Sequence, residues 1–216
     1  MRMTKTFLPV AVGALLAGQS QIAIADAFKT EASATLVSQY VFRGFDLSTE
    51  DPAVQGDFIV NHDSGFSFGA WGSTYDVGSD DGVEVDLMAS YSIEVNKDLS
   101  FGIGLTEYTY TGDTDASTEF YVSASFQQFS LTYYDDTDLN TTYISLDAEF
   151  EVIDDVAVQF HYGDYDFDAG GGSSDWSIGG SFAATKALSL FALYTDNDLN
   201  VQGAEDYFVV GASYAF

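Results

Sequence analysis

Apolar and polar residues alternate with a period of two along nearly the whole chain, and this pattern limits the folds open to it. In residues 83–95 every second residue, beginning with Val83, is apolar or aromatic, whereas Glu84, Asp86 and Glu94 lie between them. The pattern is repeated at 141–152, 156–163 and 175–184. Successive side chains of a strand point to opposite faces, so this period predicts strands with one apolar and one polar face. We therefore expect an all-β fold.

The first 25 residues have the features of a cleaved secretory signal peptide. Arg2 and Lys5 precede an apolar run at residues 7–17, and Ala23 and Ala25 supply the small residues of a cleavage site. A membrane anchor is the alternative, but this run is shorter than the roughly 20 apolar residues that span a bilayer. We expect residues 1–25 to be removed and residues 26–216 to form one domain.

The charge of the exported chain excludes several classes of function. The full chain has a net charge of −28, and loss of Arg2 and Lys5 leaves four basic residues against 34 acidic ones, a net charge of −30. A nucleic-acid-binding protein needs a basic surface, which four Lys and Arg residues cannot supply. The absence of cysteine excludes disulfides, thiolate metal ligands and cysteine nucleophiles.

Twelve strand-like segments can be counted, and the connections between them alternate in length. The predicted strands are 33–43, 53–61, 65–76, 83–95, 98–111, 118–126, 129–134, 141–152, 156–163, 175–184, 187–195 and 206–216. The long connections are 44–52, 77–82, 112–117, 135–140, 164–174 and 196–205, and the others are tight turns. Tight periplasmic turns and longer extracellular loops are typical of bacterial outer-membrane barrels. Ten strands is the alternative, if 129–134 pairs differently.

The apolar face of these strands could meet lipid or line a soluble barrel, and two features favour lipid. Twelve strands enclose a wider lumen than eight, and an apolar lining would leave a large apolar cavity. The last strand places Phe208, Val210, Tyr214 and Phe216 on one face, similar to the assembly signal of outer-membrane proteins. We expect a transmembrane antiparallel β-barrel in the bacterial outer membrane, in contact with the bilayer and lipopolysaccharide. The assembly machinery is expected to recognise the strand that ends at Phe216.

Several segments of the exported chain resemble a known family. They are 38–44 (SQYVFRG), 51–56 (DPAVQG), 62–66 (HDSGF), 69–73 (GAWGS) and 84–87 (EVDL), with shorter blocks at 119–122, 161–163 and 175–179. On these segments the chain is similar to the TorF-type porin family over essentially its whole exported length. The resemblance implies an outer-membrane porin, and it brings neither a defined substrate nor catalytic residues.

If the apolar face meets lipid, the polar face lines the lumen and is strongly acidic. The predicted pore-lining residues are Arg43, Asp57, Glu84, Asp86, Glu94, Glu119, Asp147, Glu149 and Glu151, with Gln39, Gln55 and His161 on the same face. Rings of acidic side chains favour cations in a pore. We therefore expect a passive diffusion channel for small solutes that prefers cations. The alternative is a plugged lumen in a non-conducting structural or surface-interaction barrel.

Arg43 has two interpretations, because it lies at the outer end of the first predicted strand. It is either a constriction residue that faces carboxylates or one half of a structural ion pair that fixes the first loop. A buried Arg among carboxylates is usually paired, so we favour the ion pair.

The long loops are acidic and contain no Lys or Arg. Their sharpest metal-site candidate is Asp164, Asp166, Asp168 and Asp175, whose spacing is similar to that of an EF-hand calcium loop. Ala169 stands where that motif needs glycine, and strands flank the segment instead of helices. A solvated acidic rim is the preferred interpretation, because runs of charge are usually solvated. Calcium at the extracellular loops is the weaker expectation, and no other cofactor is expected.

No catalytic constellation is evident in the sequence. A hydrolase of the triad type needs a nucleophile, a histidine and an acidic residue close together at the substrate. His62 lies in a predicted turn and His161 on the inner face. We therefore predict no catalytic residues and do not expect an enzyme.

Overall fold

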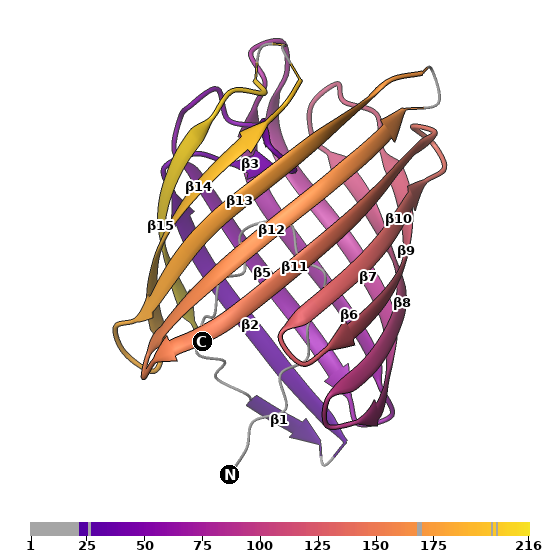
Figure 1. Ribbon diagram of the computed structural model, residues 1–216, viewed down its shortest axis with the longest axis vertical. Coiled ribbons are helices and arrows are strands. Elements are labelled where there is room, and N and C mark those ends of the chain that lie inside the picture. The colour runs from indigo at the N-terminus through magenta and orange to yellow at the C-terminus, as the bar shows by residue number, and fades with distance from the viewer. Residues whose placement is uncertain (1–21, 26, 168–169, 200, 202) are drawn as a thin grey trace.

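The computed structural model describes residues 22–25, 27–167, 170–199, 201 and 203–216, and it consists of β-strands (Figure 1). The first eight strands are β1 (Ile22–Ala25), β2 (Phe28–Val37), β3 (Val41–Phe42), β4 (Phe45–Asp46), β5 (Ala53–His62), β6 (Phe66–Asp76), β7 (Asp81–Asn96) and β8 (Leu99–Tyr110). The remaining strands are β9 (Ser117–Phe126), β10 (Phe129–Asp136), β11 (Thr141–Ile153), β12 (Val156–Phe167), β13 (Gly172–Ala183), β14 (Leu188–Asn197) and β15 (Tyr207–Ala215). Within the described residues no helix is long and apolar enough to cross a membrane.

The main sheet closes on itself. The strands from β5 to β15 pair antiparallel in chain order, and β2 pairs with both β15 and β5. These twelve strands form a closed barrel, which confirms the predicted all-β architecture. β10 pairs with both β9 and β11, so the ten-strand alternative is wrong.

β1 pairs with the beginning of β2 and adds no strand to the ring (Figure 1). It belongs to the predicted signal peptide, of which residues 1–21 lie outside the described residues. Cleavage after residue 25 therefore stays a prediction.

The connections alternate between the two ends of the barrel as predicted. One end, here called the loop end, carries the connections 38–52, 77–80, 111–116, 137–140, 168–171 and 198–206. The other, the turn end, carries the short connections 63–65, 97–98, 127–128, 154–155 and 184–187 together with the C-terminus (Figure 1). Some loops are shorter than predicted because the strands continue into them. β12 runs to Phe167 and β13 begins at Gly172, within the predicted loop 164–174.

The apolar face of the strands points outward. In β7 the side chains of Val83, Val85 and Leu87 are exposed on the outside, whereas Glu84 and Asp86 between them are buried inside. Exposed aromatic side chains lie near both ends of the barrel, among them Phe126, Phe129 and Phe216 at the turn end and Tyr133, Tyr162 and Trp176 towards the loop end. A closed barrel with an outward apolar band between aromatic belts is the form that spans outer membranes. The soluble alternative, with an apolar lining, is wrong.

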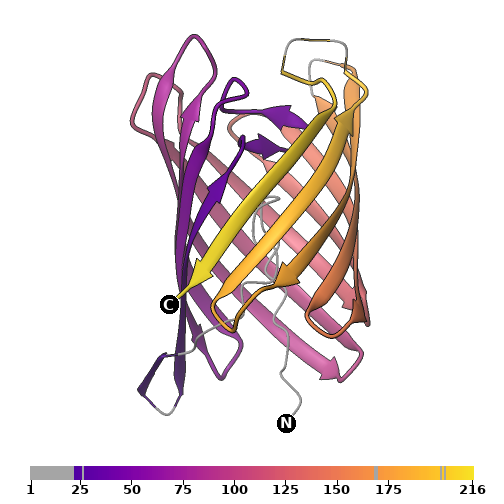
Figure 2. The same cartoon turned by 90° about the vertical axis from the view of Figure 1, so that its left-hand side faces the viewer.

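The first wall strand differs from its predicted position at 33–43. β2 begins earlier, at Phe28, and ends at Val37. Residues 38–52, here called the inward loop, leave the wall and fold into the lumen at the loop end (Figure 2). Within this loop β3 and β4 form a separate two-strand hairpin. Residues 40–42 are Tyr, Val and Phe, which all favour strands, so residue preference alone extends the first strand too far.

Candidate functional site

A tight turn at Arg43 and Gly44 shapes the inward loop. These two residues alone join β3 to β4, and their φ angles are 50° and 79°. Two positive φ values in a two-residue hairpin connection indicate a type I′ turn. Glycine suits the second position, because a Cβ at residue 44 would lie 2.7 Å from the Cβ of Asn197. The left-handed conformation costs Arg43 about 1–2 kcal/mol, which its contacts must offset.

The guanidinium of Arg43 forms a bidentate ion pair with Glu119 in β9. Its Nη1 donates to Oε1 at 2.7 Å and its Nη2 donates to Oε2 at 2.8 Å. Nη1 also donates to the hydroxyl of Tyr165 at 2.7 Å, and the Tyr108 hydroxyl donates to Glu119 at 3.0 Å. Arg43 is 6% exposed and Glu119 4%. This is the structural ion pair that we favoured for Arg43, in the geometry that makes charged hydrogen bonds strongest.

Four aromatic rings surround the same guanidinium. Its central carbon lies 4.7 Å from the ring centroid of Phe42, 4.5 Å from that of Tyr134, 4.2 Å from Tyr143 and 5.2 Å from Tyr165. Desolvated cation–π contacts of this kind stabilise by as much as about 2 kcal/mol. The three tyrosines belong to β10, β11 and β12, so they tie the inward loop to the wall. These tyrosines were not among the predicted site residues, although their inward positions in the predicted strands were a usable signal.

A second network surrounds His161 on the inner face of β12. Its Nδ1 lies 2.6 Å from Asp147 Oδ1, and its Nε2 lies 3.0 Å from Asp175 Oδ1. The hydroxyl of Tyr143 donates to Asp175 at 2.9 Å. Gly163 leaves the room that this tyrosine needs, because a Cβ there would overlap its hydroxyl. Since both ring nitrogens face carboxylates, a protonated His161 donates to both and counters their charge.

The structure does not gather the four predicted calcium ligands. Asp164 and Asp166 lie in β12 with exposed side chains on the outer face, whereas Asp175 in β13 is buried in the lumen. Asp168 lies outside the described residues. No three His, Cys, Asp or Glu side chains of the described residues form a group that could hold a metal. The physical reason is that most of the predicted loop is strand, so alternate residues point to opposite faces. Calcium binding elsewhere on the loops stays a prediction.

The remaining predicted lumen acids lie on the inner face and differ in exposure. Glu84 and Asp86 are buried, Asp57, Asp147 and Glu149 are half-buried, and Glu94 and Glu151 are exposed next to the turn end. The acidic inner face is thus accessible to solvent towards the turn end. At the loop end it is covered by the inward loop.

The inward loop also packs against an apolar part of the wall. Tyr40 and Val41 join a buried cluster that includes Phe191, Leu193 and Val209 on the inner faces of β14 and β15. Burying one such side chain contributes about 1.5–3 kcal/mol. The loop is therefore anchored on two sides of the ring, by apolar contacts here and by the Arg43 ion pair at β9.

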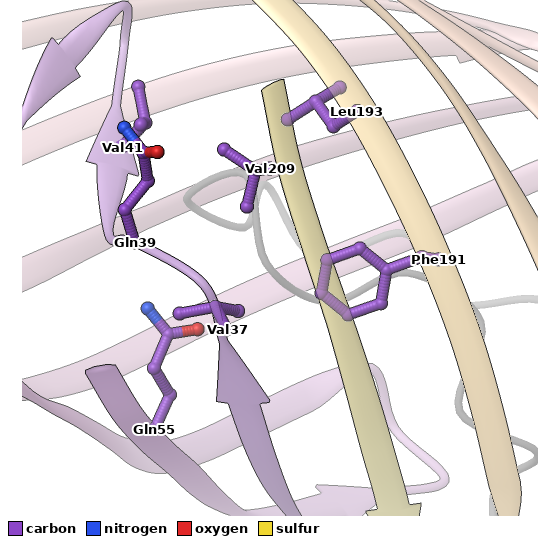
Figure 3. A pocket seen from close by; sticks show the side chains of 7 residues that line it. All are labelled: Val37, Gln39, Val41, Gln55, Phe191, Leu193 and Val209. Atoms are coloured by element: carbon purple, nitrogen blue, oxygen red, sulfur yellow. The ribbon is translucent and has the colours of Figure 1, made fainter. Parts of the chain in front are cut away.

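A small cavity lies beside this apolar contact (Figure 3). Gln39 and Gln55 face Phe191, Leu193 and Val209 across it, and its volume is about 10 Å³. A volume of this size holds about one water molecule. The inward loop is therefore closely packed against this side of the lumen.

Asp80 joins two neighbouring loops at the loop end. Its carboxylate accepts hydrogen bonds from the Tyr75 hydroxyl at 2.6 Å, the Thr114 hydroxyl at 2.6 Å and the backbone N–H of Asp113 at 2.9 Å. The hydrogen bonds from Thr114 and Tyr75 hold the pKa of Asp80 well below its ordinary value. The loop at 77–80 is thereby fastened to the loop at 111–116.

Comparison with known sequences identifies a family. The sequence model of Gcw_chp, described as a bacterial protein of unknown function, matches residues 23–212. No curated protein matches the chain. The family name found is thus Gcw_chp, and the finer TorF-type name stays a prediction.

Solved structures with the same fold are outer-membrane porins and channels. The KdgM porin superposes with a TM-score of 0.64 at 12% identity, over 87% of this chain and 99% of that one. The NanC porin gives 0.61 at 10% identity, over 86% and 98%. The outer membrane channel from Pseudomonas putida F1 gives 0.53 at 10% identity, over 95% and 98%. At these identities the likeness shows the fold, which is the outer-membrane porin barrel that we predicted.

Proposed function

We propose that this chain, which belongs to the Gcw_chp family of bacterial proteins of unknown function, is a porin-like passive diffusion channel of the outer membrane that prefers cations. Its closed barrel and outward apolar band support a membrane-spanning role. The KdgM and NanC porins, which share the fold, support a channel. The proposed role includes no enzymatic step.

The charge of the inner face is the observation that carries the proposal. Arg43, the single arginine of the described residues, is already paired with Glu119. Carboxylates remain accessible in the lumen, among them Asp147, whose side chain is 45% exposed, and the exposed Glu94 and Glu151. Acidic rings favour cations, and a wall of low dielectric constant focuses their field into the lumen.

The same charge argues against acidic solutes. The KdgM porin has been solved in complex with oligogalacturonate, a chain of acidic sugars. The acidic inner face of the present barrel repels a polyanion of that kind. We therefore propose small cations and small uncharged solutes as the permeating class.

Ion selectivity in a planar bilayer across a KCl gradient tests the proposal. We expect discrete conductance steps and a reversal potential of the sign for cations. Asp147→Asn combined with Glu149→Gln is expected to move the reversal potential towards zero, because it removes two lumen charges. Asp164→Asn combined with Asp166→Asn is the matched control, since it removes two charges from the outer face. A reversal potential of anion sign, or one that the lumen variant leaves unchanged, contradicts the proposal.

A non-conducting structural or surface-interaction barrel is the second candidate function. The observation in its favour is the inward loop, which packs across the lumen at the loop end. Inserted protein without any conductance would support this candidate. If deletion of residues 39–50 then produced conductance, the inward loop would be identified as the plug.

We also propose two partners for the barrel, lipopolysaccharide and the outer-membrane assembly machinery. Tyr214 and Phe216 are exposed on the outer face at the end of the chain, and the N–H of Phe216 donates to Ala32 at 3.0 Å. The aromatic end of β15 is thus presented where the barrel closes against β2.

A further inference from the structure

We propose that Glu84 and Asp86 form a binding site for a hard divalent cation inside the lumen, next to the inward loop. The proposal deepens the proposed cation channel and rests on it for its functional meaning. It places a discrete site on the inner face, apart from the loop residues predicted to bind calcium.

The two carboxylates are neighbours on the inner face of β7. They are two residues apart in one strand, and they are close enough to interact with each other. The Tyr110 hydroxyl donates to Glu84 Oε1 at 3.2 Å from the neighbouring strand β8. Tyr40 of the inward loop lies beside both carboxylates. Four oxygen-bearing side chains from the wall and the inward loop thus converge.

The burial of these carboxylates leaves two oxygens without a hydrogen bond. Glu84 is 2% exposed and Asp86 5%. Oε2 of Glu84 and Oδ1 of Asp86 accept no hydrogen bond from any described residue. Buried polar atoms in native proteins ordinarily have a partner, and a charged atom without one is especially costly. Two such oxygens on neighbouring side chains point to a ligand that both bind.

The positive charges nearby are occupied by other carboxylates. Arg43 gives both of its terminal nitrogens to Glu119, and His161 lies between Asp147 and Asp175. No ion pair among the described residues includes Glu84 or Asp86. An uncompensated buried charge is strongly unfavourable, and here two lie side by side. A bound cation would supply the missing positive charge.

The donor atoms select the class of cation. Carboxylate oxygens from Glu84 and Asp86, with phenol oxygens from Tyr40 and Tyr110, form a set that contains only oxygen. Ca²⁺ and Mg²⁺ prefer such ligands, and Ca²⁺ accepts irregular geometry. A divalent ion neutralises both carboxylates, whereas one shared proton neutralises only one. Ca²⁺ is therefore the probe for the site.

Calorimetric titration of the folded barrel in detergent with Ca²⁺ tests this inference. In salt of about 0.15 M, which screens the exposed acids, Glu84→Gln combined with Asp86→Asn is expected to lower the binding stoichiometry by one ion per barrel. The matched control is Asp164→Asn with Asp166→Asn, which removes two charges from the outer face and is expected to keep that ion. Tyr110→Phe leaves both carboxylates in place and is expected to weaken binding about tenfold. A change in electrophoretic mobility on heating verifies that each variant is folded.

Two results would overturn the site. One is equal stoichiometry in the parent and in the Glu84→Gln, Asp86→Asn variant. The other is an infrared band of a protonated carboxyl in the calcium-treated parent that this variant lacks, because the pair then holds a proton instead of an ion. The titration needs no bilayer, so its outcome is separate from conductance. A barrel that binds Ca²⁺ at this pair but conducts no ions refutes the proposed channel and leaves the site standing.

Discussion

Replacing Arg43 with glutamine is expected to release the inward loop from the wall. The substitution removes the bidentate pair with Glu119 and the hydrogen bond to Tyr165, and it leaves Glu119 as a buried charge without a positive partner. Breaking one side of a buried ion pair costs roughly 3–5 kcal/mol. Because about 1.4 kcal/mol corresponds to a tenfold change in an equilibrium constant, the opened loop should become roughly 10²- to 5 × 10³-fold more populated.

The rate of cysteine labelling measures this opening, because the native chain contains no cysteine. Val41→Cys places one thiol on the buried side of the inward loop, and a soluble maleimide reaches it only when the loop opens. Adding Arg43→Gln should accelerate labelling by the factor given above. Asp51→Cys, at an exposed position of the same loop, supplies the rate for an accessible thiol.

A further substitution distinguishes the effect of the unpaired Glu119 charge from a general loss of packing in the loop. Adding Glu119→Gln to the Arg43→Gln, Val41→Cys variant removes the buried carboxylate that has lost its ion-pair partner. The labelling rate should therefore fall back towards that of Val41→Cys alone. Equal labelling rates with and without Arg43→Gln would refute the role given to the ion pair. Labelling of Val41→Cys as fast as that of Asp51→Cys would refute the packing of the loop itself.

Two further predictions concern packing and pH. Gly163→Ala should lower the free energy of unfolding by about 1–3 kcal/mol, because the added Cβ overlaps the Tyr143 hydroxyl, whereas in the control Gly180→Ala the Cβ meets only an ordinary contact at 3.6 Å. The temperature at which each variant changes from folded to unfolded migration on a detergent gel measures this difference. Equal midpoints for the two variants contradict this account. The depressed pKa of Asp80 contributes stability that is complete above about pH 4, the ordinary pKa of aspartate, and is lost as pH falls through the lower folded value. The backbone N–H of Thr114 also donates to Asp80, at 3.0 Å. Hydrogen-exchange protection of this amide should therefore persist at pH 4 and disappear only below it, and Asp80→Asn should weaken the protection at neutral pH. Loss of protection in the parent above pH 4 contradicts the sign.

The wall of the barrel could be predicted because apolar and polar residues alternate within each strand, and this pattern is local in the sequence. Residues 83–95 reveal both faces of β7 without knowledge of any neighbour, and the short turns and long loops then order the strands. The inward loop could not be predicted in this way, since Tyr40, Val41 and Phe42 favour a strand as wall residues do. The two-residue hairpin at Arg43 and Gly44 was the local signal of a break, because glycine favours the positive φ that such turns need.

The contacts inside the lumen were harder to predict, because they join residues far apart in the chain. The period of two predicted that Glu119 faces the lumen, as it does, whereas Arg43 reaches the lumen on the inward loop and not on a wall strand. The two residues are 76 positions apart, and only the folding of the loop brings them together. Asp175 was expected to bind calcium at the edge of the loop 164–174, yet the longer β13 buries it beside His161. A residue's face follows from period two, whereas its partner depends on strand register and on where a loop turns inward.

The anchoring of the inward loop implies an order of events during assembly. Arg43 follows β2, the first strand of the ring, yet its ligands Glu119 and Tyr165 lie 76 and 122 residues later. The site that binds the Arg43 guanidinium therefore does not exist until β9 and β12 have been inserted and aligned. In a barrel that closes in the wrong register, Arg43 cannot form its contacts with Glu119 and Tyr165. The inward loop therefore gains its final stabilising contacts only after the wall has closed in the correct register.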